Sequence, residues 1–101
     1  MMRDATGAQL RLLPWTTPEG GPCYLSTSDP NSRLSCMADE LETELLDSAE
    51  FVLGQARPLL VEEGAGEREL RFAGLRLAEA LGDVLRIAVS RGARLPDGWK
   101  P

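Results

Sequence analysis

Histidine is absent from this sequence, and several other chemically useful residue types are scarce. The 101 residues contain one lysine, two cysteines, two tryptophans, two phenylalanines and one tyrosine. Without histidine, the chain lacks the most common general base and the most common metal ligand. None of the six serines lies in a G-x-S-x-G turn, which would present a catalytic nucleophile. These absences argue against an enzyme, and they predict neither a cofactor nor a metal site.

Long apolar runs are missing as well. No stretch approaches the roughly 20 consecutive apolar residues that span a bilayer, and the N-terminal residues show no apolar signal core or cleavage site. We therefore expect a cytoplasmic protein without membrane contact. In that compartment the only cysteines, Cys23 and Cys36, are expected to be free thiols, with a disulfide as the alternative. The net charge of −5 argues against binding to nucleic acid.

Helical periodicity is what the sequence does contain, and it is clearest from Glu67 to Arg91. Leucine, alanine and valine recur there at spacings of three and four, which gives a helix one wide apolar face. The triplet Ser90-Arg91-Gly92 is typical of a helix end, because a cation suits the last turn and glycine suits a left-handed cap. This stretch therefore predicts a long helix.

A second periodic stretch, Ser32–Leu60, predicts another long helix. It begins after a cap at Asp29, or else at Ser32. Pro58 is expected to kink or end it. A loop with two glycines then leads to the helix described above, so the two helices are expected to form an antiparallel hairpin.

The centres of the two apolar stripes predict the core. Its expected members are Leu41, Leu45, Val52, Leu77, Leu81 and Val84. Truncating Leu81 to alanine is then expected to lower the free energy of unfolding by roughly 2–5 kcal/mol.

Ahead of the helices, Gln9–Trp15 and Pro22–Ser28 flank a segment rich in proline and glycine, which predicts a β-hairpin. Trp15 and Tyr24 are expected either to anchor this hairpin on the helices or to line a pocket. Trp99 is expected either to cover the end of the helices or to contact a partner.

These elements predict a mostly α fold of the α+β class, in a single domain over residues 1–101. The N-terminal segment 1–31 contains the β-hairpin, residues 32–94 form the helical hairpin, and residues 95–101 form a tail. An isolated two-stranded hairpin is marginal in water, so we expect it to lean on the helices.

Each predicted helix has more apolar surface than one antiparallel neighbour can cover. The surplus residues form our candidate interface: Leu46, Phe51, Leu53, Leu60, Phe72 and Leu75. Contiguous exposed apolar patches usually mark an interface, so we expect a homodimer that forms a four-helix bundle. The alternatives are an unidentified protein partner, or coverage by the β-hairpin and the tail. The sequence thus favours a small non-catalytic protein–protein interaction or regulatory module.

The run Glu79-Ala80-Leu81-Gly82-Asp83-Val84-Leu85 resembles the E-E-L-G-D-V-L segment of MazG-type all-α nucleotide pyrophosphohydrolases. In that family this helix and an earlier helix with an E-E-x-x-E motif hold magnesium over a nucleoside triphosphate. Only Asp83 carries over cleanly, since Ala80 stands at the position of a ligand glutamate. The first helix of this chain offers Glu40, Glu42 and Glu44, at alternate positions, which do not reproduce the acidic motif. The resemblance implies, as the alternative function, a magnesium-dependent pyrophosphohydrolase relative without activity.

A second resemblance covers more of the chain. Four segments carry it: Leu13-Pro14-Trp15-Thr16, Pro18-x-Gly20-x-Pro22-Cys23-Tyr24-Leu25, Ser32-Arg33-Leu34 and Ser90-Arg91-Gly92-Ala93-Arg94-Leu95. They are similar to segments of a group of small actinobacterial proteins. This resemblance implies a cytosolic bacterial protein and adds no site residue.

Overall fold

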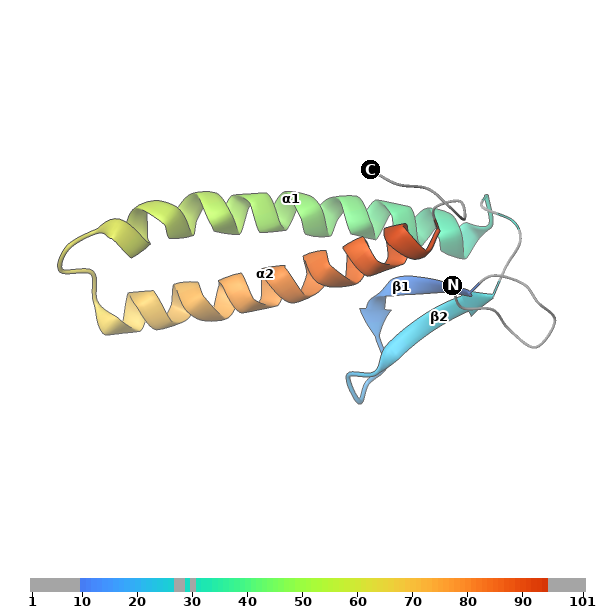
Figure 1. The fold of residues 1–101 in the computed structure, drawn as a ribbon, viewed down its shortest axis with the longest axis horizontal. Helices are drawn as coiled ribbons and strands as arrows, with labels where there is room; N and C mark the ends of the chain where they lie inside the picture. Colours follow the sequence, from blue (N-terminus) through green and yellow to red (C-terminus); the bar gives the residue numbers. More distant parts are fainter. Residues whose placement is uncertain (1–9, 27–28, 30, 95–101) are drawn as a thin grey trace.

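The computed structural model describes residues 10–26, 29 and 31–94. Its elements, in chain order, are β1 (Leu10–Thr16), β2 (Pro22–Ser26), α1 (Arg33–Val61) and α2 (Glu67–Ala93). The helices form a long antiparallel hairpin, and the strands form a small β-hairpin beside its open end (Figure 1). The predicted fold, mostly α with a small β part, is confirmed. The tail with Trp99 lies outside the described residues.

β1 and β2 pair as antiparallel strands, with Leu12 opposite Tyr24. The turn between them is closed by backbone hydrogen bonds from Gly20 N to Thr17 O and from Thr17 N to Gly21 O, both 2.8 Å long. Gly20 has a φ of 85°, a left-handed conformation that glycine adopts without strain. The glycine pair in the predicted loop is therefore what allows the chain to reverse here.

The strand pairing is irregular around Pro14. After Leu12 opposite Tyr24, the next paired position is Thr16 opposite Pro22, so three residues of β1 face a single residue of β2. Proline has no N–H group to donate, and such an irregularity accommodates it without the loss of a regular pairing. Pro14 and its neighbour Leu13 are buried, because β1 packs against α2 and, less extensively, against α1.

α1 begins after Ser32, the second of the two predicted starts. The Ser32 Oγ accepts a hydrogen bond from Ser35 N (3.2 Å), which satisfies one of the free N–H groups of the first turn. Asp29 has a different role, since its Oδ1 accepts a hydrogen bond from Asn31 N (2.9 Å) in a turn that precedes the helix.

Pro58 does not end α1, which continues to Val61. A proline at this position removes the N–H that would donate to Gly54, and Gly54 is exposed, so water can hydrate its carbonyl. The loop to α2 then passes through Gly64, whose φ of 82° is again left-handed. α2 starts with acidic residues in its first turn, which suit the positive end of the helix dipole.

The core lies in the contact between α1 and α2 and under β1. Its buried apolar residues are Leu13, Ala38, Val52, Ala56, Ala73 and Ile87. Three of the six are alanines, so this core contains little side-chain volume for a domain of this length.

The core prediction is correct for Val52 and wrong for Leu81, which is 59% exposed. The other predicted members, Leu41, Leu45, Leu77 and Val84, are half-buried. The reason is the direction in which α2 faces. Ala73, Ala80 and Ile87 are seven residues apart and lie toward α1, and Leu81 is about 100° further around the helix. The predicted cost of truncating Leu81 therefore does not apply to a single chain.

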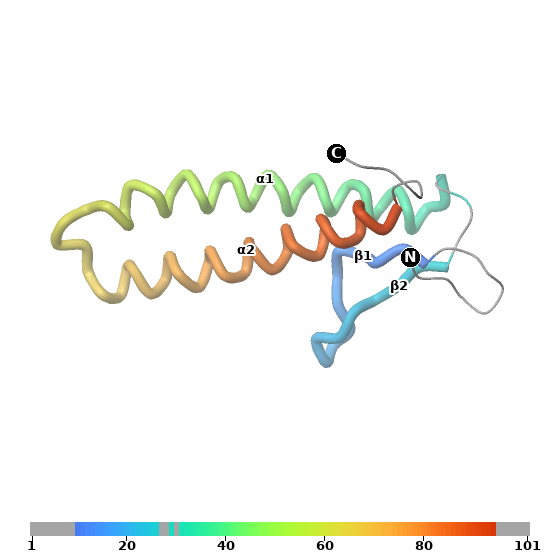
Figure 2. Tube along the Cα trace, in the orientation of Figure 1, coloured from blue at the N-terminus to red at the C-terminus, as the bar shows by residue number. Residues whose placement is uncertain are grey.

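The described residues form one layer. Viewed down the shortest axis, α1, α2 and the β-hairpin lie side by side (Figure 1), and the turn of the β-hairpin points away from the helices (Figure 2). The Cα radius of gyration is 17.0 Å, against about 13 Å for a compact domain of this length. Within the described ranges, neither helix combines the length and apolar character needed to cross a membrane.

Replacing Val52 with alanine is expected to lower the free energy of unfolding by about 2 kcal/mol, because it removes two buried methyl groups and leaves a cavity. The matched control is Val61→Ala, since Val61 is 81% exposed, against 7% for Val52. The control should change the free energy by no more than about 0.5 kcal/mol. Urea denaturation at one fixed protein concentration measures both changes. Equal losses in the two variants would contradict the orientation of α1.

Candidate interaction surfaces

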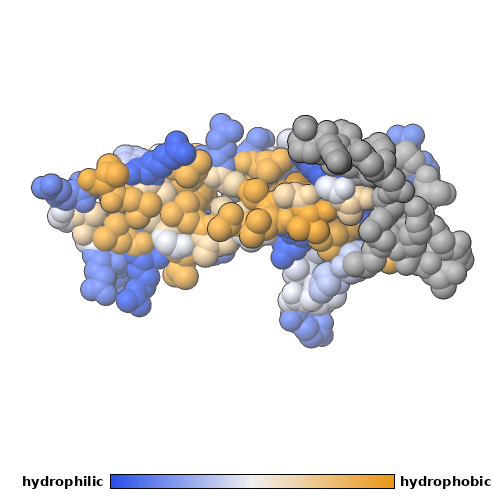
Figure 3. Space-filling view, in the orientation of Figure 1, coloured by the Kyte–Doolittle hydropathy of each residue, from blue (hydrophilic) through white to orange (hydrophobic). Residues whose placement is uncertain are grey.

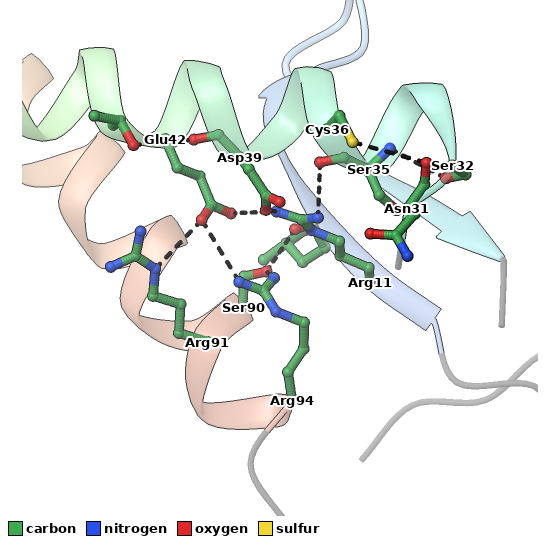
Figure 4. Close-up of polar contacts among 12 residues, drawn as sticks. Arg11, Asn31, Ser32, Ser35, Cys36, Asp39, Glu42, Ser90, Arg91 and Arg94 are labelled. Carbon is green, nitrogen blue, oxygen red and sulfur yellow. Dashed lines mark hydrogen bonds and ion pairs between the residues drawn. The ribbon is translucent and has the colours of Figure 1, made fainter. Parts of the chain in front are cut away.

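A buried carboxylate holds three arginines together where β1 meets the two helices (Figure 4). Glu42 of α1 is only 1% exposed. Its Oε2 accepts a hydrogen bond from Arg11 Nη2 of β1 (3.2 Å), and its Oε1 accepts one from Arg91 Nε of α2 (3.3 Å). Arg94 Nη2 lies 3.5 Å from the same Oε1. One side chain of α1 therefore connects to both β1 and the end of α2.

Arg11 makes most of the polar contacts on the β1 side. It also donates from Nη2 to Asp39 Oδ1 (2.7 Å) and from Nη1 to the backbone carbonyl of Ser35 (3.1 Å). Its Nε is buried and has no hydrogen-bond partner within the described part of the chain. Removal of any partner of Arg11 would therefore leave a buried cation with even fewer compensating contacts.

Ser90 and Arg94 complete the cluster at the end of α2. Ser90 Oγ donates to the backbone carbonyl of Leu12 (2.7 Å) and accepts a hydrogen bond from the Arg94 guanidinium. Burial of Arg94, together with the positive charge of Arg11, lowers the pKa of its guanidinium, and Glu42 opposes this shift. Both oxygens of Glu42 are engaged by guanidinium groups. The cluster is therefore suited to fixing the β-hairpin in place, and not to acid–base chemistry on a substrate.

Sequence reasoning missed this cluster. A signal for it was present, because Glu42 follows Ala38 by four residues and precedes Ala49 by seven, which places it in the apolar stripe of α1. Its place in a run of acidic residues hides that position. Its partners Arg11 and Arg91 lie 31 and 49 residues away, so no local pattern connects them.

Several exposed apolar residues of the helical hairpin lie on one or the other of its two broad faces. On α1, buried Val52 faces α2, and its neighbours point about 100° to either side, Phe51 to one and Leu53 to the other. On α2, Phe72 precedes buried Ala73 in the same way, and it lines a groove together with Phe51. Residues that come directly before a residue facing the other helix, such as Phe51 and Phe72, therefore lie on one broad face. Residues that come directly after such a residue, such as Leu53, lie on the opposite broad face.

We call that opposite face the leucine face. Its members are Leu46, Leu53, Leu60 and Leu81, with Leu77 one turn before Leu81. Three of them are exposed, and Leu46 and Leu77 are half-buried. In the space-filling view, apolar residues form a band along the helical hairpin on the broad face turned toward the viewer (Figure 3). No other described element covers the length of this hairpin.

The phenylalanine face carries a groove between α1 and α2, in the half of the hairpin near the α1–α2 loop. The groove has a volume of about 450 Å³ and a floor of Ala56 and Ala73. Phe51 and Phe72, which are 68% and 66% exposed, stand at its edges. A smaller cavity of about 210 Å³ adjoins it and shares Val52 as a lining residue.

The candidate interface residues do not form a single surface. The three leucines of α1 belong to the leucine face, and both phenylalanines belong to the opposite face. Leu75 lies about 200° around α2 from buried Ala73, so it points away from α1 and belongs to neither face. Sequence reasoning missed Leu81, Leu85 and Val89 as exposed residues. Their spacing marks them as apolar-stripe residues, but spacing cannot tell which part of a wide stripe a partner covers.

A third groove, of about 330 Å³, lies between the β-hairpin and α2. Tyr24 lines it together with Leu85 and Val89. Trp15 is half-buried and is not among its lining residues. The two aromatic residues that were expected to anchor the hairpin or to line a pocket therefore differ in their surroundings.

The carboxylates of the segment Glu79–Leu85 lie on the phenylalanine face, where Glu79 and Asp83 line the smaller cavity. Each already pairs with an arginine of its own helix, Glu79 with Arg76 at 3.2 Å and Asp83 with Arg86 at 3.5 Å. Among the residues that the structure describes, no three cysteine, aspartate or glutamate side chains are grouped so that they could hold a metal ion.

The two cysteines do not form a disulfide. Cys23 is half-buried and Cys36 is exposed, and both are free thiols. The Cys36 Sγ makes a long contact of 3.8 Å with the backbone carbonyl of Asn31.

Comparison with protein-family models, with curated proteins and with solved structures finds no match for this chain.

Replacing Glu42 with glutamine is expected to lower the free energy of unfolding by about 3 kcal/mol, because three arginines lose their shared carboxylate. Glu44→Gln is the matched control, since Glu44 is exposed on the same helix, and its effect should stay below about 0.5 kcal/mol. Urea denaturation measures both, and amide hydrogen exchange should become faster in β1 of the Glu42 variant alone. Losses of similar size in the two variants would show that the cluster does not hold the β-hairpin.

Proposed function

We propose that this protein is a small non-catalytic interaction module that works as a homodimer, in which the leucine faces of two copies pack together as a four-helix bundle. The observation that carries the proposal is the apolar face that a one-layer fold leaves open (Figure 3). Stable domains bury their core between two layers, and a helical hairpin supplies only one. A second copy would provide the missing layer.

The exposure of the leucines on this face supports the proposal. Leu53, Leu60 and Leu81 are large apolar side chains, yet they are 41%, 53% and 59% exposed in the single chain. Contiguous exposed apolar residues of this kind usually mark an interface.

The charges of the helices favour a second copy as the occupant of the leucine face. Residues 32–61 carry two arginines and six acidic residues, a net charge of −4, and residues 67–94 carry six arginines and four acidic residues, a net charge of +2. When α1 of one copy lies beside α2 of the other, these charges attract each other across a two-fold interface. The row of α2 at this face contains no charged residue: Gly74, Ala78, Leu81, Leu85 and Ala88.

Light scattering at tens of micromolar is expected to give twice the chain mass of 11.0 kDa. Leu53→Glu and Leu81→Glu each place a charge in the leucine face, so each variant should be monomeric while circular dichroism shows most of its helix retained. Leu75→Glu is the matched control, because Leu75 lies on the same helix as Leu81 and is similarly exposed, at 61%, but points elsewhere. This control should remain dimeric.

A single-chain mass for the unaltered protein would rule out the homodimer. A dimer that survives both leucine-face substitutions but is lost in Leu75→Glu would place the interface on another surface.

A further inference from the structure

We propose that the phenylalanine face binds a basic amphipathic helix of a partner protein, seated in the groove between α1 and α2. Apolar side chains of that helix enter the groove between Phe51 and Phe72, and its lysines and arginines meet carboxylates further along the face. The site is separate from the leucine face, because Phe51 and Leu53 lie about 200° apart around α1. It is therefore accessible in a monomer and in the proposed homodimer alike.

The groove has the form that helix recognition requires. Its floor residues, Ala56 and Ala73, are small and almost fully buried, so the opening between the helices is deep enough to admit side chains. Leu59 extends its apolar lining, and Phe51 and Phe72 flank it with two largely exposed rings. An apolar groove of this kind takes the residues that recur at three and four on one face of an amphipathic helix. Exposed aromatic side chains at its edges can supply a large part of the binding energy.

The charge of the face selects the sign of the partner. Glu44 and Asp47 precede Phe51 by seven and four residues, so they continue its row along α1, about 10 Å and 6 Å from it along the helix axis. Both are exposed, and neither forms an ion pair with another residue that the structure describes. These carboxylates are therefore available to cations of a partner.

The cations on the α2 side of the same face are either paired already or lie apart from these carboxylates. Arg76 and Arg86 are paired with Glu79 and Asp83. Arg68, which precedes Phe72 by one turn, lies near the α1–α2 loop, at the opposite end of the groove from Glu44 and Asp47. The face therefore combines an apolar groove at one end with unpaired carboxylates beyond it, and the whole chain carries a net charge of −5. Complementary potential favours a basic partner and disfavours an acidic one.

The test uses a designed helical peptide of about 18 residues, with leucines at i, i+3, i+4 and i+7 and lysines on the flanks. In a second peptide every lysine is replaced by glutamate. Both are fluorescently labelled, and their binding to the full chain is followed by anisotropy at low and at high salt, because screening separates ionic from apolar contributions. The lysine peptide should bind, and the glutamate peptide should show no binding up to about 200 μM.

Two double variants each remove one feature of the face. Phe51→Ala with Phe72→Ala should weaken binding of the lysine peptide by about tenfold or more at both salt concentrations. Glu44→Gln with Asp47→Asn should weaken it about tenfold at low salt and much less at high salt. Leu75→Ala is the control for loss of an exposed apolar side chain outside the groove, and it should leave the affinity within about twofold.

Two further measurements keep the test informative if a variant loses its fold or if the dimer fails. Monomeric Leu81→Glu should bind the lysine peptide as the unaltered protein does, so a failure of the homodimer leaves this proposal intact. Amide chemical shifts of the unaltered protein should change around Phe51, Leu59 and Phe72 when the peptide is added.

Four results would overturn the proposal. They are absence of binding by the lysine peptide, equal binding of both peptides, unchanged affinity in the folded phenylalanine variant, and shift changes centred on the leucine face or the β-hairpin. Unchanged affinity in the folded phenylalanine variant would mean that the peptide is held by diffuse charge attraction alone.

Discussion

Two helices that pack only against each other can each bury one stripe, and this limit shapes the rest of the molecule. In α1 and α2 that stripe contains several alanines, including Ala56 and Ala73, so the large leucines lie beside the contact instead of inside it. The same geometry therefore gives a small core and two apolar faces. A chain of this length has little stability to spare, and burial of one face by another molecule would add to it.

The Glu42 cluster makes the two ends of the helical hairpin different. At the loop end, the turn around Gly64 and the packing of small residues such as Ala56 and Ala73 join the helices. At the other end, Glu42 holds β1 and the end of α2 through three arginines (Figure 4). Burying these charges is costly, so the cluster contributes position more than net stability. The cluster keeps the β-hairpin beside the end of α2. In that position the β-hairpin does not form a second layer along the length of the helices.

The helices and the β-hairpin could be predicted because their signals are local. Periodicity marked both helices, the glycines around Gly20 marked the turn, and Ser32 was one of two expected caps. The rotation of each helix could not be predicted, and Leu81 shows why. Any part of a wide apolar arc can face the partner, and here the choice depends on contacts between distant residues, such as Arg11 with Glu42. Phe51 could be placed on the other side of the α1 stripe from the leucines by its spacing alone. That Phe72 shares a face with Phe51 could not be predicted, because it depends on how α2 is rotated against α1.

The central claim is that a second copy covers the leucine face in solution. Nuclear magnetic resonance of leucine methyl groups, in the presence of a soluble paramagnetic agent, tests it most directly. If the claim is correct, the methyl groups of Leu53 and Leu81 are shielded from the agent at high protein concentration and become accessible on dilution, while those of Leu75 are accessible throughout. Equal and strong relaxation of all three leucines at every concentration would contradict it.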